Sequence, residues 1–260
     1  MIIFIKVINM SYRKDLRIVI SCVTFDTVKI IEPIKFFKAD KAYLFHKADR
    51  IPYTDFLDEI IRQLESLGIE HKEIFSNVNK FEELMPDLIK VMENEIDNGN
   101  HVFVNIEAGS AVYSSASLIA SMMLGATPFN EGSKDHMIDD HKKYYDEKGR
   151  PVGLAKSVRE PYLLPAFHLE KPPEKLVHGL KIWNEVRIKY GNRKLKETIQ
   201  MMEKTGLLKD CMERNKVSHS GHMFFRRNFL QKWIDKGWIE KDEERIYQLT
   251  SDGEMIIKVL

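Results

Sequence analysis

The four residues Glu107-Ala108-Gly109-Ser110, in the middle of the chain, have the composition of a ligand-binding turn. They follow residues 101–106, an apolar run typical of a buried β-strand. Gly109 permits a tight turn, and Ser110 can cap a helix that begins at Ala111. A strand that enters a helix this way leaves backbone N–H groups free at the carboxyl edge of a parallel sheet, where anionic ligands bind. The pattern predicts an anion site; the alternative is an ordinary strand–helix turn without a ligand.

Four charged residues are expected at strand ends or in loops near the same edge: Asp26, Lys47, Lys156 and Arg159. The simplest explanation of a charged side chain in a loop is that it is solvated. If the edge binds a phosphate group, Lys156 and Arg159 are the cations best placed to contact it. Lys and Arg donate charge-assisted hydrogen bonds to phosphate oxygens.

The sequence contains no arrangement that predicts a metal centre or a common type of catalytic centre. His136, Asp139, Asp140 and His141 carry metal-binding groups, but they lie in a polar loop without a second ligand pair. No Ser-His-Asp or Cys-His arrangement is evident, and no Walker or GxGxxG loop is present. We therefore expect neither a metal nor a bound cofactor.

The C-terminal third is basic and offers side chains that suit DNA. Residues 174–260 contain 18 Lys and Arg against 13 Asp and Glu. Lys and Arg neutralise phosphates, whereas Ser, His and Arg can reach base edges. The candidate DNA-binding residues lie on a helix expected from His219 to Lys236, on its N-cap and on the segment that follows: Ser218, His219, Ser220, His222, Arg226, Arg227, Lys241 and Arg245. The alternatives are a protein-binding surface or a basic face that is merely solvated. The acidic residues 242–244 argue against entry of the last segment into a DNA groove.

The elements that must position the turn at 107–110 and the charged residues near it alternate between strand and helix. Apolar runs and helical spacing predict strands at 16–24, 41–46, 71–75, 101–106 and 127–130, with helices at 28–37, 54–67, 81–96 and from 111 onward. This order predicts an α/β fold with a Rossmann-like, mostly parallel sheet and helices on both faces. Residues 132–153 are expected to form an inserted loop or hairpin. Tyr162–Leu169 is expected to be an edge strand because Pro165 lacks an N–H group.

The remaining elements predict a small winged helix-turn-helix domain. Helices are expected at 195–208, 209–215, 219–236 and 254–260, with two short strands at 238–239 and 246–249. In such a domain the third helix begins in the DNA major groove. The predicted division is a Rossmann-like domain over residues 1–173, a linker helix over 174–192 and the winged helix over 193–260.

Length and composition fit a protein that buries its own apolar core. The 260 residues are 43% hydrophobic and 30% charged, with a formal net charge of +1. Cys22 and Cys211 lie far apart and form no CxxC, which suits a reduced, cytoplasmic setting. The opening run Met1–Asn9 is too short to span a bilayer and lacks a secretory cleavage pattern. It is either an extra edge strand or a segment ahead of a true start at Met10.

From Leu16 onward the chain resembles a CARF (CRISPR-associated Rossmann fold) protein of the archaeal transcriptional-regulator type, with a C-terminal winged helix. The segments that carry the resemblance are VISCVTFDTVKIIEPI, KADKAYLFHK, VNIEAGSAVYSSASLIASMMLGATPF and WIDKGWIEKDEERIYQLTSDG. The resemblance implies a homodimer whose CARF domains bind a cyclic oligoadenylate. By position, it implies ligand contacts from the first loop, Thr24, Phe25 and Asp26, and from the second, Glu107, Ala108, Gly109 and Ser110.

The second loop departs from the pattern of this family. In relatives the turn is rich in Gly, Ser or Thr and a basic residue follows, whereas here Glu107 adds a negative charge and Ala111 adds none. A carboxylate beside a phosphate costs binding free energy unless a cation intervenes. Either the ligand differs, or Glu107 meets a ribose hydroxyl, or the site has lost its ligand.

Three functions follow from the resemblance. The first is a regulator, associated with CRISPR, that senses a cyclic oligoadenylate and binds double-stranded DNA through its winged helix. The second is a ring nuclease, which cleaves the cyclic ligand with the help of a hydroxyl or basic group such as Thr24 or Lys156. The third is a dimer that binds DNA constitutively and has no ligand.

Overall fold

The computed structural model of the chain describes residues 15–47, 54–136, 153, 155–165, 167–192, 194–213 and 216–260. The chain divides into two compact units, Met1–Leu169 and Glu170–Leu260. Three of the metal candidates, Asp139, Asp140 and His141, lie outside the described residues, as does the opening run Met1–Asn9. No helix in these described ranges is both long and apolar enough to cross a membrane.

The first unit is an α/β fold built on a six-stranded sheet with the order β3-β2-β1-β4-β5-β8. Its strands are β1 (Arg17–Cys22), β2 (Lys41–His46), β3 (Glu70–Phe75), β4 (His101–Asn105), β5 (Thr127–Asn130) and β8 (Tyr162–Leu163). All neighbours from β3 to β5 pair in parallel, and β8 pairs with β5 antiparallel. The Rossmann-like, mostly parallel sheet predicted from the alternation of strands and helices is confirmed.

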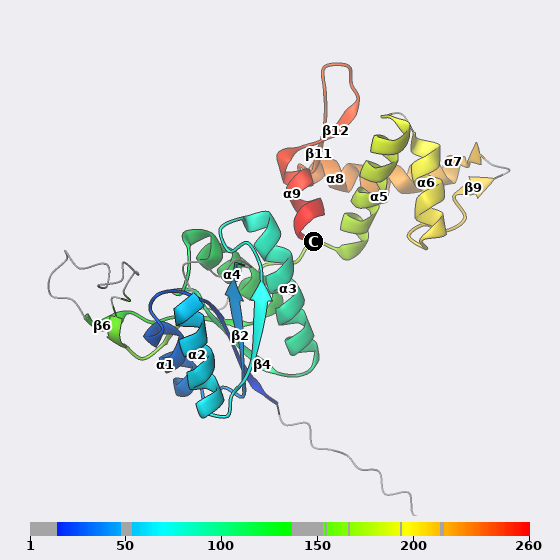
Figure 1. Cartoon of the computed structure of the whole chain (residues 1–260). Coiled ribbons are helices and arrows are strands. Elements are labelled where there is room, and N and C mark those ends of the chain that lie inside the picture. The colour runs from blue at the N-terminus through cyan, green and yellow to red at the C-terminus, as the bar shows by residue number, and fades with distance from the viewer. Residues whose placement is uncertain are drawn as a thin grey trace, which may run out of the picture. The chain divides into compact units, whose positions relative to one another are not determined.

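Four helices connect the parallel strands and cover both faces of the sheet (Figure 1). They are α1 (Val28–Phe36), α2 (Thr54–Ser66), α3 (Phe81–Asp97) and α4 (Ala111–Leu124). The inner faces of α1 and α2 pack on the side chains of Val19 and Val23, which point to one face of β1. Ile18 and Ile20 alternate with them and are equally buried, on the other face. Burial on both faces explains why β1 reads as a continuous apolar run.

The sheet reverses its winding direction between β1 and β4. From β1 the chain proceeds outward through β2 to β3, and it then returns to place β4 on the opposite side of β1. The loops that leave the carboxyl ends of β1 and β4 therefore diverge and open a crevice between them, the position at which open α/β sheets bind ligands.

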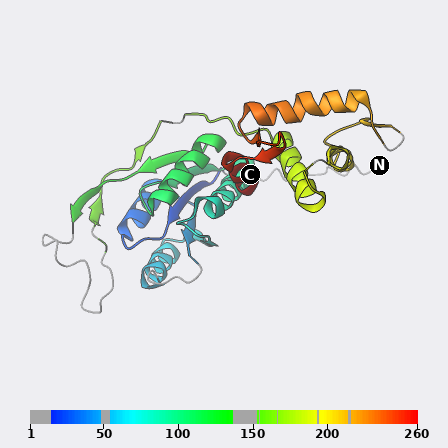
Figure 2. The same cartoon turned by 90° about the horizontal axis from the view of Figure 1, so that it is seen from above.

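The segment after β5 differs from the expected strand in its length. Among the described residues of the predicted run Tyr162–Leu169, Tyr162 and Leu163 form the strand β8 at the edge of the sheet, so the predicted edge position is confirmed and the predicted length is wrong. Pro165 accounts for the early end, because it has no N–H group to donate to a neighbouring strand. The inserted segment before it contains an antiparallel pair, β6 (Ser133–His136) with β7 (Ala155–Val158), drawn in green in Figure 2.

The second unit is mainly helical and contains two antiparallel pairs of very short strands. Its elements are α5 (Glu174–Tyr190), α6 (Leu195–Lys204), β9 (Met212–Glu213), β10 (Lys216–Val217), α7 (His219–Phe225), η1 (Arg226–Leu230), α8 (Gln231–Asp235), β11 (Ile239–Lys241), β12 (Tyr247–Leu249) and α9 (Ser251–Val259). α5, for which the sequence suggested a linking role, contributes Leu180 and Trp183 to the apolar core of this unit.

The helix predicted at 209–215 is wrong, because Met212 and Glu213 pair with β10 as a strand. Gly206 has a φ of +75° and ends the turn after α6. The Glu203 carboxylate then accepts the backbone N–H groups of Cys211 and Met212. A side-chain acceptor thus takes two donors that a helix would have bonded to its own carbonyls.

α7, η1 and α8 form one continuous helix, drawn in orange in Figure 2. Its buried residues Gly221, Phe225, Phe229 and Trp233 are spaced by four. An α-helix advances 3.6 residues per turn, so strict spacing by four would move successive side chains around the helix. The π-helical turn η1 holds more residues per turn and keeps all four on the inner face.

Candidate functional site

A cavity of about 430 Å³ opens at the carboxyl edge of the parallel sheet, in the crevice between β1 and β4. Four segments line it: the loop after β1 with the first turn of α1, the end of β2, the loop after β3, and the turn after β4. We call it the switch-point pocket. Its lining residues are Cys22, Val23, Thr24, Phe25, Asp26, Lys29, His46, Lys47, Val78, Asn79, Glu107, Gly109 and Ser110.

The structure brings six of the nine predicted ligand residues to this pocket: Thr24, Phe25, Asp26, Glu107, Gly109 and Ser110. Ala108 is only 1% exposed and packs into the core below. Lys156 and Arg159 are exposed and do not line the pocket. Lys156 lies on β7, which Arg159 follows, and β7 is bonded to the first loop, because the Ala155 N–H group donates to Asp26 Oδ1 at 2.8 Å.

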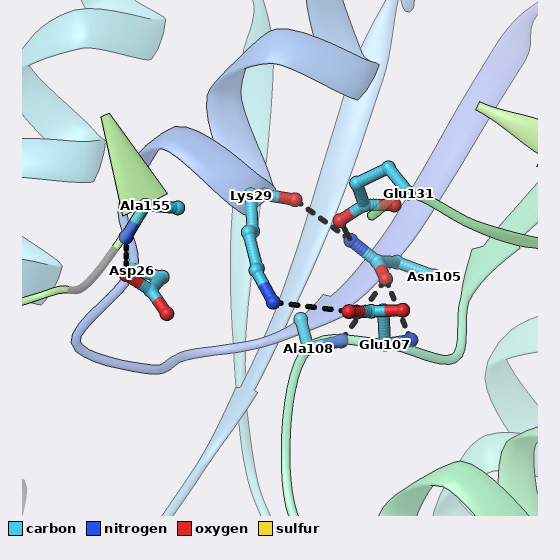
Figure 3. Close-up of polar contacts among 7 residues, drawn as sticks. All are labelled: Asp26, Lys29, Asn105, Glu107, Ala108, Glu131 and Ala155. Atoms are coloured by element: carbon cyan, nitrogen blue, oxygen red, sulfur yellow. Dashed lines mark hydrogen bonds and ion pairs between the residues drawn. The ribbon is translucent and has the colours of Figure 1, made fainter. Parts of the chain in front are cut away.

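Asn105, the last residue of β4, determines the shape of the turn that follows it (Figure 3). Its Oδ1 accepts the backbone N–H groups of Glu107 and Ala108 at 3.0 and 3.1 Å. Its Nδ2 donates to the Lys29 carbonyl at 2.8 Å and to Glu131 Oε1 at 3.0 Å. The side chain is fully buried and makes four hydrogen bonds, so it ties α1, β4 and the end of β5 to one turn.

Lys29, in the first turn of α1, supplies the cation that the sequence seemed to lack. Its Nζ lies 3.0 Å from Glu107 Oε1, and the two side chains are 16% and 28% exposed. The negative charge of Glu107 is therefore neutralised within the pocket. Sequence reasoning missed Lys29 because it looked for a basic residue after the second turn. The first turn of α1, directly after the loop that follows β1, was an equally suitable place for a basic residue.

The turn after β4 offers backbone donors and keeps its own hydroxyl occupied. Ser110 Oγ accepts the Tyr113 N–H group at 3.2 Å and donates to the Val78 carbonyl at 2.8 Å, so the predicted N-cap is confirmed. Within the described part of the chain, no acceptor pairs with the N–H groups of Gly109 to Val112. These groups are the first donors of α4, and such donors favour an anion.

His46 and Cys22 of the pocket have defined surroundings, whereas one hydroxyl lacks a partner among the described residues. Both ring nitrogens of His46 have partners, the Lys47 carbonyl at 2.8 Å and Glu73 Oε2 at 3.1 Å. Burial raises the pKa of the Cys22 thiol to about 12, so the thiol remains protonated. Thr24 Oγ1 is buried without a hydrogen-bond partner among the described residues. The described residues include no group of three or more His, Cys, Asp or Glu side chains that could hold a metal ion.

Glu131, just after β5, is a second group that the sequence did not reveal. Its side chain is only 1% exposed, and Oε2 has no hydrogen-bond partner within the described residues. Burial is the main cause that raises the pKa of Glu131 to about 8, and the Glu107 carboxylate adds to the effect. The hydrogen bond from Asn105 and the charge of Lys29 act in the opposite direction. Nothing in the local sequence distinguishes this glutamate from a surface one.

In the second unit, most of the predicted DNA-binding residues lie on the surface. His219, Ser220, His222, Arg226 and Arg227 are exposed along α7 and η1, and Lys241 and Arg245 are exposed on the β11–β12 hairpin. Ser218 is different: it is buried, accepts the Gly221 N–H group at 2.9 Å and donates to the Cys211 carbonyl at 3.1 Å. It caps α7 and does not face solvent.

The acidic residues of the hairpin include one with a clear structural role. The Asp242 carboxylate accepts the Ile246 N–H group at 2.8 Å and the Gln248 side-chain amide at 2.6 Å. Arg245, with a φ of +61°, completes the same turn. Asp242 thus shapes the hairpin. This structural role accounts for an acidic residue at position 242 whatever the hairpin contacts.

Comparison with known proteins gives one family and a group of solved structures. The family model described as "HFX_2341_N:-like, N-terminal" matches residues 17–134. No curated protein matches the chain. A type III CRISPR defence DNA nuclease activated by cyclic oligoadenylate is 13% identical with a TM-score of 0.42, over 74% of this chain and 30% of the nuclease.

Two further structures are similar over more of this chain. Can2 from Sulfobacillus thermosulfidooxidans, in complex with cyclic tetra-adenylate, is 8% identical with a TM-score of 0.39, over 94% of this chain and 63% of its own. Csm6 from Enterococcus italicus, bound to cyclic hexa-2'-fluoro-hexa-dAMP, is 10% identical with a TM-score of 0.42, over 86% and 55%. The chain spans less than two thirds of the length of all three structures. With identities of 13% or less, none of these likenesses assigns a ligand or an activity.

Proposed function

We propose that this chain is a CARF-type regulator that binds a cyclic oligoadenylate in the switch-point pocket and double-stranded DNA through its second unit, acting as a homodimer. The observation that carries the first part is the pocket itself. It lies where the sheet reverses its winding, and six residues that the resemblance predicted converge on it.

The chemistry of the pocket suits a nucleotide that carries several phosphates. The N–H groups at the start of α4 are unpaired within the described residues and favour anions. Lys29 neutralises Glu107, Lys47 adds a positive charge, and Phe25 contributes an aromatic ring from the loop after β1. Paired with Lys29, the Glu107 carboxylate is an acceptor for a ribose hydroxyl or an adenine amino group.

The ion pair also bears on the alternative of a dimer without a ligand. That alternative drew its support from an uncompensated acid in the phosphate-binding turn. Because Lys29 lies 3.0 Å from Glu107, the acid is compensated, and its presence no longer favours an empty pocket.

The deciding experiment incubates the purified protein with cyclic tri-, tetra- and hexa-adenylate and measures both binding and cleavage. Binding without turnover of at least one ring supports the sensor. A linear tetra-adenylate of the same charge is the control, because charge alone would bind it as well. If no ring binds more tightly than the linear control, the proposed ligand is wrong.

Ring cleavage is a second candidate because Thr24 places a hydroxyl without a hydrogen-bond partner, among the described residues, at the pocket wall. A positioned hydroxyl can orient a ribose 2′-oxygen for attack on its own phosphate. The other residue considered for this role, Lys156, does not line the pocket. Cleavage products in the same incubation, lost in Thr24→Val and retained in Thr27→Val, would support the nuclease.

For the second unit we propose a winged helix whose α7–η1–α8 helix contacts a DNA groove. The exposed Arg226 and Arg227 lie on that helix, and Lys241 lies on the hairpin that would be the wing. Two apolar side chains on the same helix are also exposed, Met223 at 53% and Phe224 at 45%. Apolar groups at such positions can contact thymine methyl groups.

The DNA proposal is tested with the double variant Arg226→Ala, Arg227→Ala on a mixed-sequence duplex. Loss of two phosphate contacts should weaken binding and reduce the slope of log affinity against log salt by about 2. The matched control is Lys196→Ala, Lys204→Ala, which removes two exposed cations from α6. Equal effects of the two double variants would mean that the chain's net charge, and not this helix, binds DNA.

A further inference from the structure

We propose that Glu131 is a positioning residue of the switch-point pocket: through Asn105 it fixes the turn from Glu107 to Ser110, and its protonation state adjusts the affinity for an anionic ligand. The part about affinity rests on the proposed function. The part about the turn stands on the hydrogen bonds alone.

The connection consists of two consecutive sets of hydrogen bonds inside the fold. Glu131 Oε1 accepts from Asn105 Nδ2 at 3.0 Å, and Asn105 Oδ1 accepts from the N–H groups of Glu107 and Ala108. Figure 3 shows the side chains of Glu131, Asn105 and Glu107 in this order, with Lys29 beside them. Removal of the Glu131 acceptor would leave an amide N–H group of Asn105 buried and unpaired, which a folded protein avoids by reorienting the side chain.

The carboxyl group of Glu131 is placed where its charge matters to the pocket. The charged and titratable groups around it are Lys29 on α1, Glu107 after β4, Tyr113 on α4, and Arg159, which packs against the neighbouring Gly132. The pKa of about 8 keeps Glu131 neutral at pH 7. Above that pH the Glu131 carboxylate adds its negative charge to that of Glu107, and Oε2 has no hydrogen-bond donor among the described residues.

The first test needs no ligand and uses the full chain. The backbone amides of Glu107 and Ala108 are followed by two-dimensional NMR between pH 6 and pH 9.5. In the wild type their chemical shifts should titrate with a midpoint near 8. In Glu131→Gln this titration should vanish, while the shifts at pH 6 stay close to those of the wild type because the glutamine oxygen still accepts from Asn105. Glu65→Gln, at an exposed position on α2, is the matched control and should titrate like the wild type.

The second test measures the affinity for cyclic tetra-adenylate at pH 6.5 and pH 9. The wild type should bind several-fold more weakly at pH 9, because Glu131 is then negative, and Glu131→Gln should lose this difference. Glu131→Leu, which removes the acceptor, should bind about tenfold more weakly than Glu131→Gln at pH 6.5.

The two tests separate the possible failures. If none of the three rings binds to the wild type, the proposed function fails, and the amide titration still decides the role of Glu131 in the turn. If a ring binds, the second test uses that ring, and a Glu131→Gln variant that keeps the pH dependence of the wild type would make the inference about Glu131 wrong while the proposed function stands. Amides that titrate alike in the wild type and in Glu131→Gln would also overturn it.

Discussion

A single lysine decides how the acidic residue in the pocket should be interpreted. Glu107 by itself repels a phosphate, but Lys29 holds its carboxylate at 3.0 Å and the pair carries no net charge. The pair is partly buried, so its interaction is screened less by water and salt than that of a surface pair. Its two members should therefore respond to mutation in opposite directions.

Lys29→Met should weaken the binding of cyclic tetra-adenylate by about tenfold or more, because Glu107 is left as an unpaired negative charge. Glu107→Gln should strengthen it a few-fold, since Lys29 then becomes free for a phosphate. Isothermal titration calorimetry at two salt concentrations would measure both effects. Lys35→Met, on the same helix but paired with Glu32 at the surface, is the control and should bind like the wild type. Weakening by both pocket variants would mean that the pair only shapes the pocket.

Glu131 should also make the free energy of unfolding of the protein depend on pH. Its pKa is about 8 in the folded state against an ordinary value of 4.5, so the folded state binds the proton more tightly. The free energy of unfolding contributed by this group is fully present below pH 4.5 and is lost as the pH rises to about 8. Glu131→Gln should match the wild type at pH 4.5 and be more stable at pH 9, by at most about 5 kcal/mol. Urea unfolding at several pH values measures the difference, and a constant difference would contradict the prediction.

At the level of residues, the sequence predicted the loops of the site better than its contacts. Thr24, Asp26 and Gly109 could be placed because they directly follow strands whose carboxyl ends must meet at one edge. The roles of Lys29 and Glu131 could not be assigned, because they depend on an ion pair between residues 78 positions apart and on a hydrogen bond between residues 26 positions apart. Local pattern contains no information about such pairs.

At the level of elements, α4 shows how glycines define both ends of a helix next to the site. Gly109, before it, has a φ of +128°, and a Cβ atom there would lie 2.9 Å from Tyr113 Cδ1 and 3.0 Å from Cys22 Cβ. Gly125, after it, has a φ of +81° with no atom within 4 Å of the same position. At both positions a residue with a Cβ atom would be strained by the backbone conformation. Only at Gly109 would the Cβ atom also clash with neighbouring side chains.

Gly125→Ala should therefore cost about 1 kcal/mol, from the backbone conformation alone. Gly109→Ala should cost about 2 to 4 kcal/mol, because a methyl group must also displace the ring of Tyr113. It should weaken ligand binding too, since the displaced turn carries the N–H groups that have no acceptor among the described residues. Chemical denaturation of both variants provides the comparison. Equal losses of stability would show that the clash is relieved without cost.

Helices and strands were predictable where the apolar pattern was strong and not where side chains compete with the backbone. β2 and β5 have the expected bounds because apolar runs and turns delimit them clearly. The segment around Met212 was assigned to a helix because its composition permits one, and the Glu203 carboxylate that redirects its N–H groups comes from the preceding helix.

At the level of the whole molecule, each unit has its own apolar core. The core of the first gathers residues from the sheet, α1 and α2, and that of the second gathers residues from α5 to α9 around Trp233. A regulator of the proposed kind needs more than two folded units. Its ligand must bind with different affinity to the DNA-competent and DNA-incompetent states of the protein. Otherwise the ligand does not change the equilibrium between these states.

This requirement gives a prediction for the intact protein. Saturating cyclic tetra-adenylate should change the affinity for the mixed-sequence duplex by about fivefold or more, and DNA should change the affinity for the ligand by the same factor.

Lys29→Met should keep DNA binding and lose the response to a ligand concentration that saturates the wild type. The Arg226→Ala, Arg227→Ala variant should keep ligand binding, because its substitutions lie in the other unit. Fluorescence anisotropy with labelled DNA and calorimetry with the ligand measure the two halves of the cycle. A DNA affinity that the ligand leaves unchanged, in a protein that binds both, would reduce the chain to two independent binding modules and remove the regulatory part of the proposal.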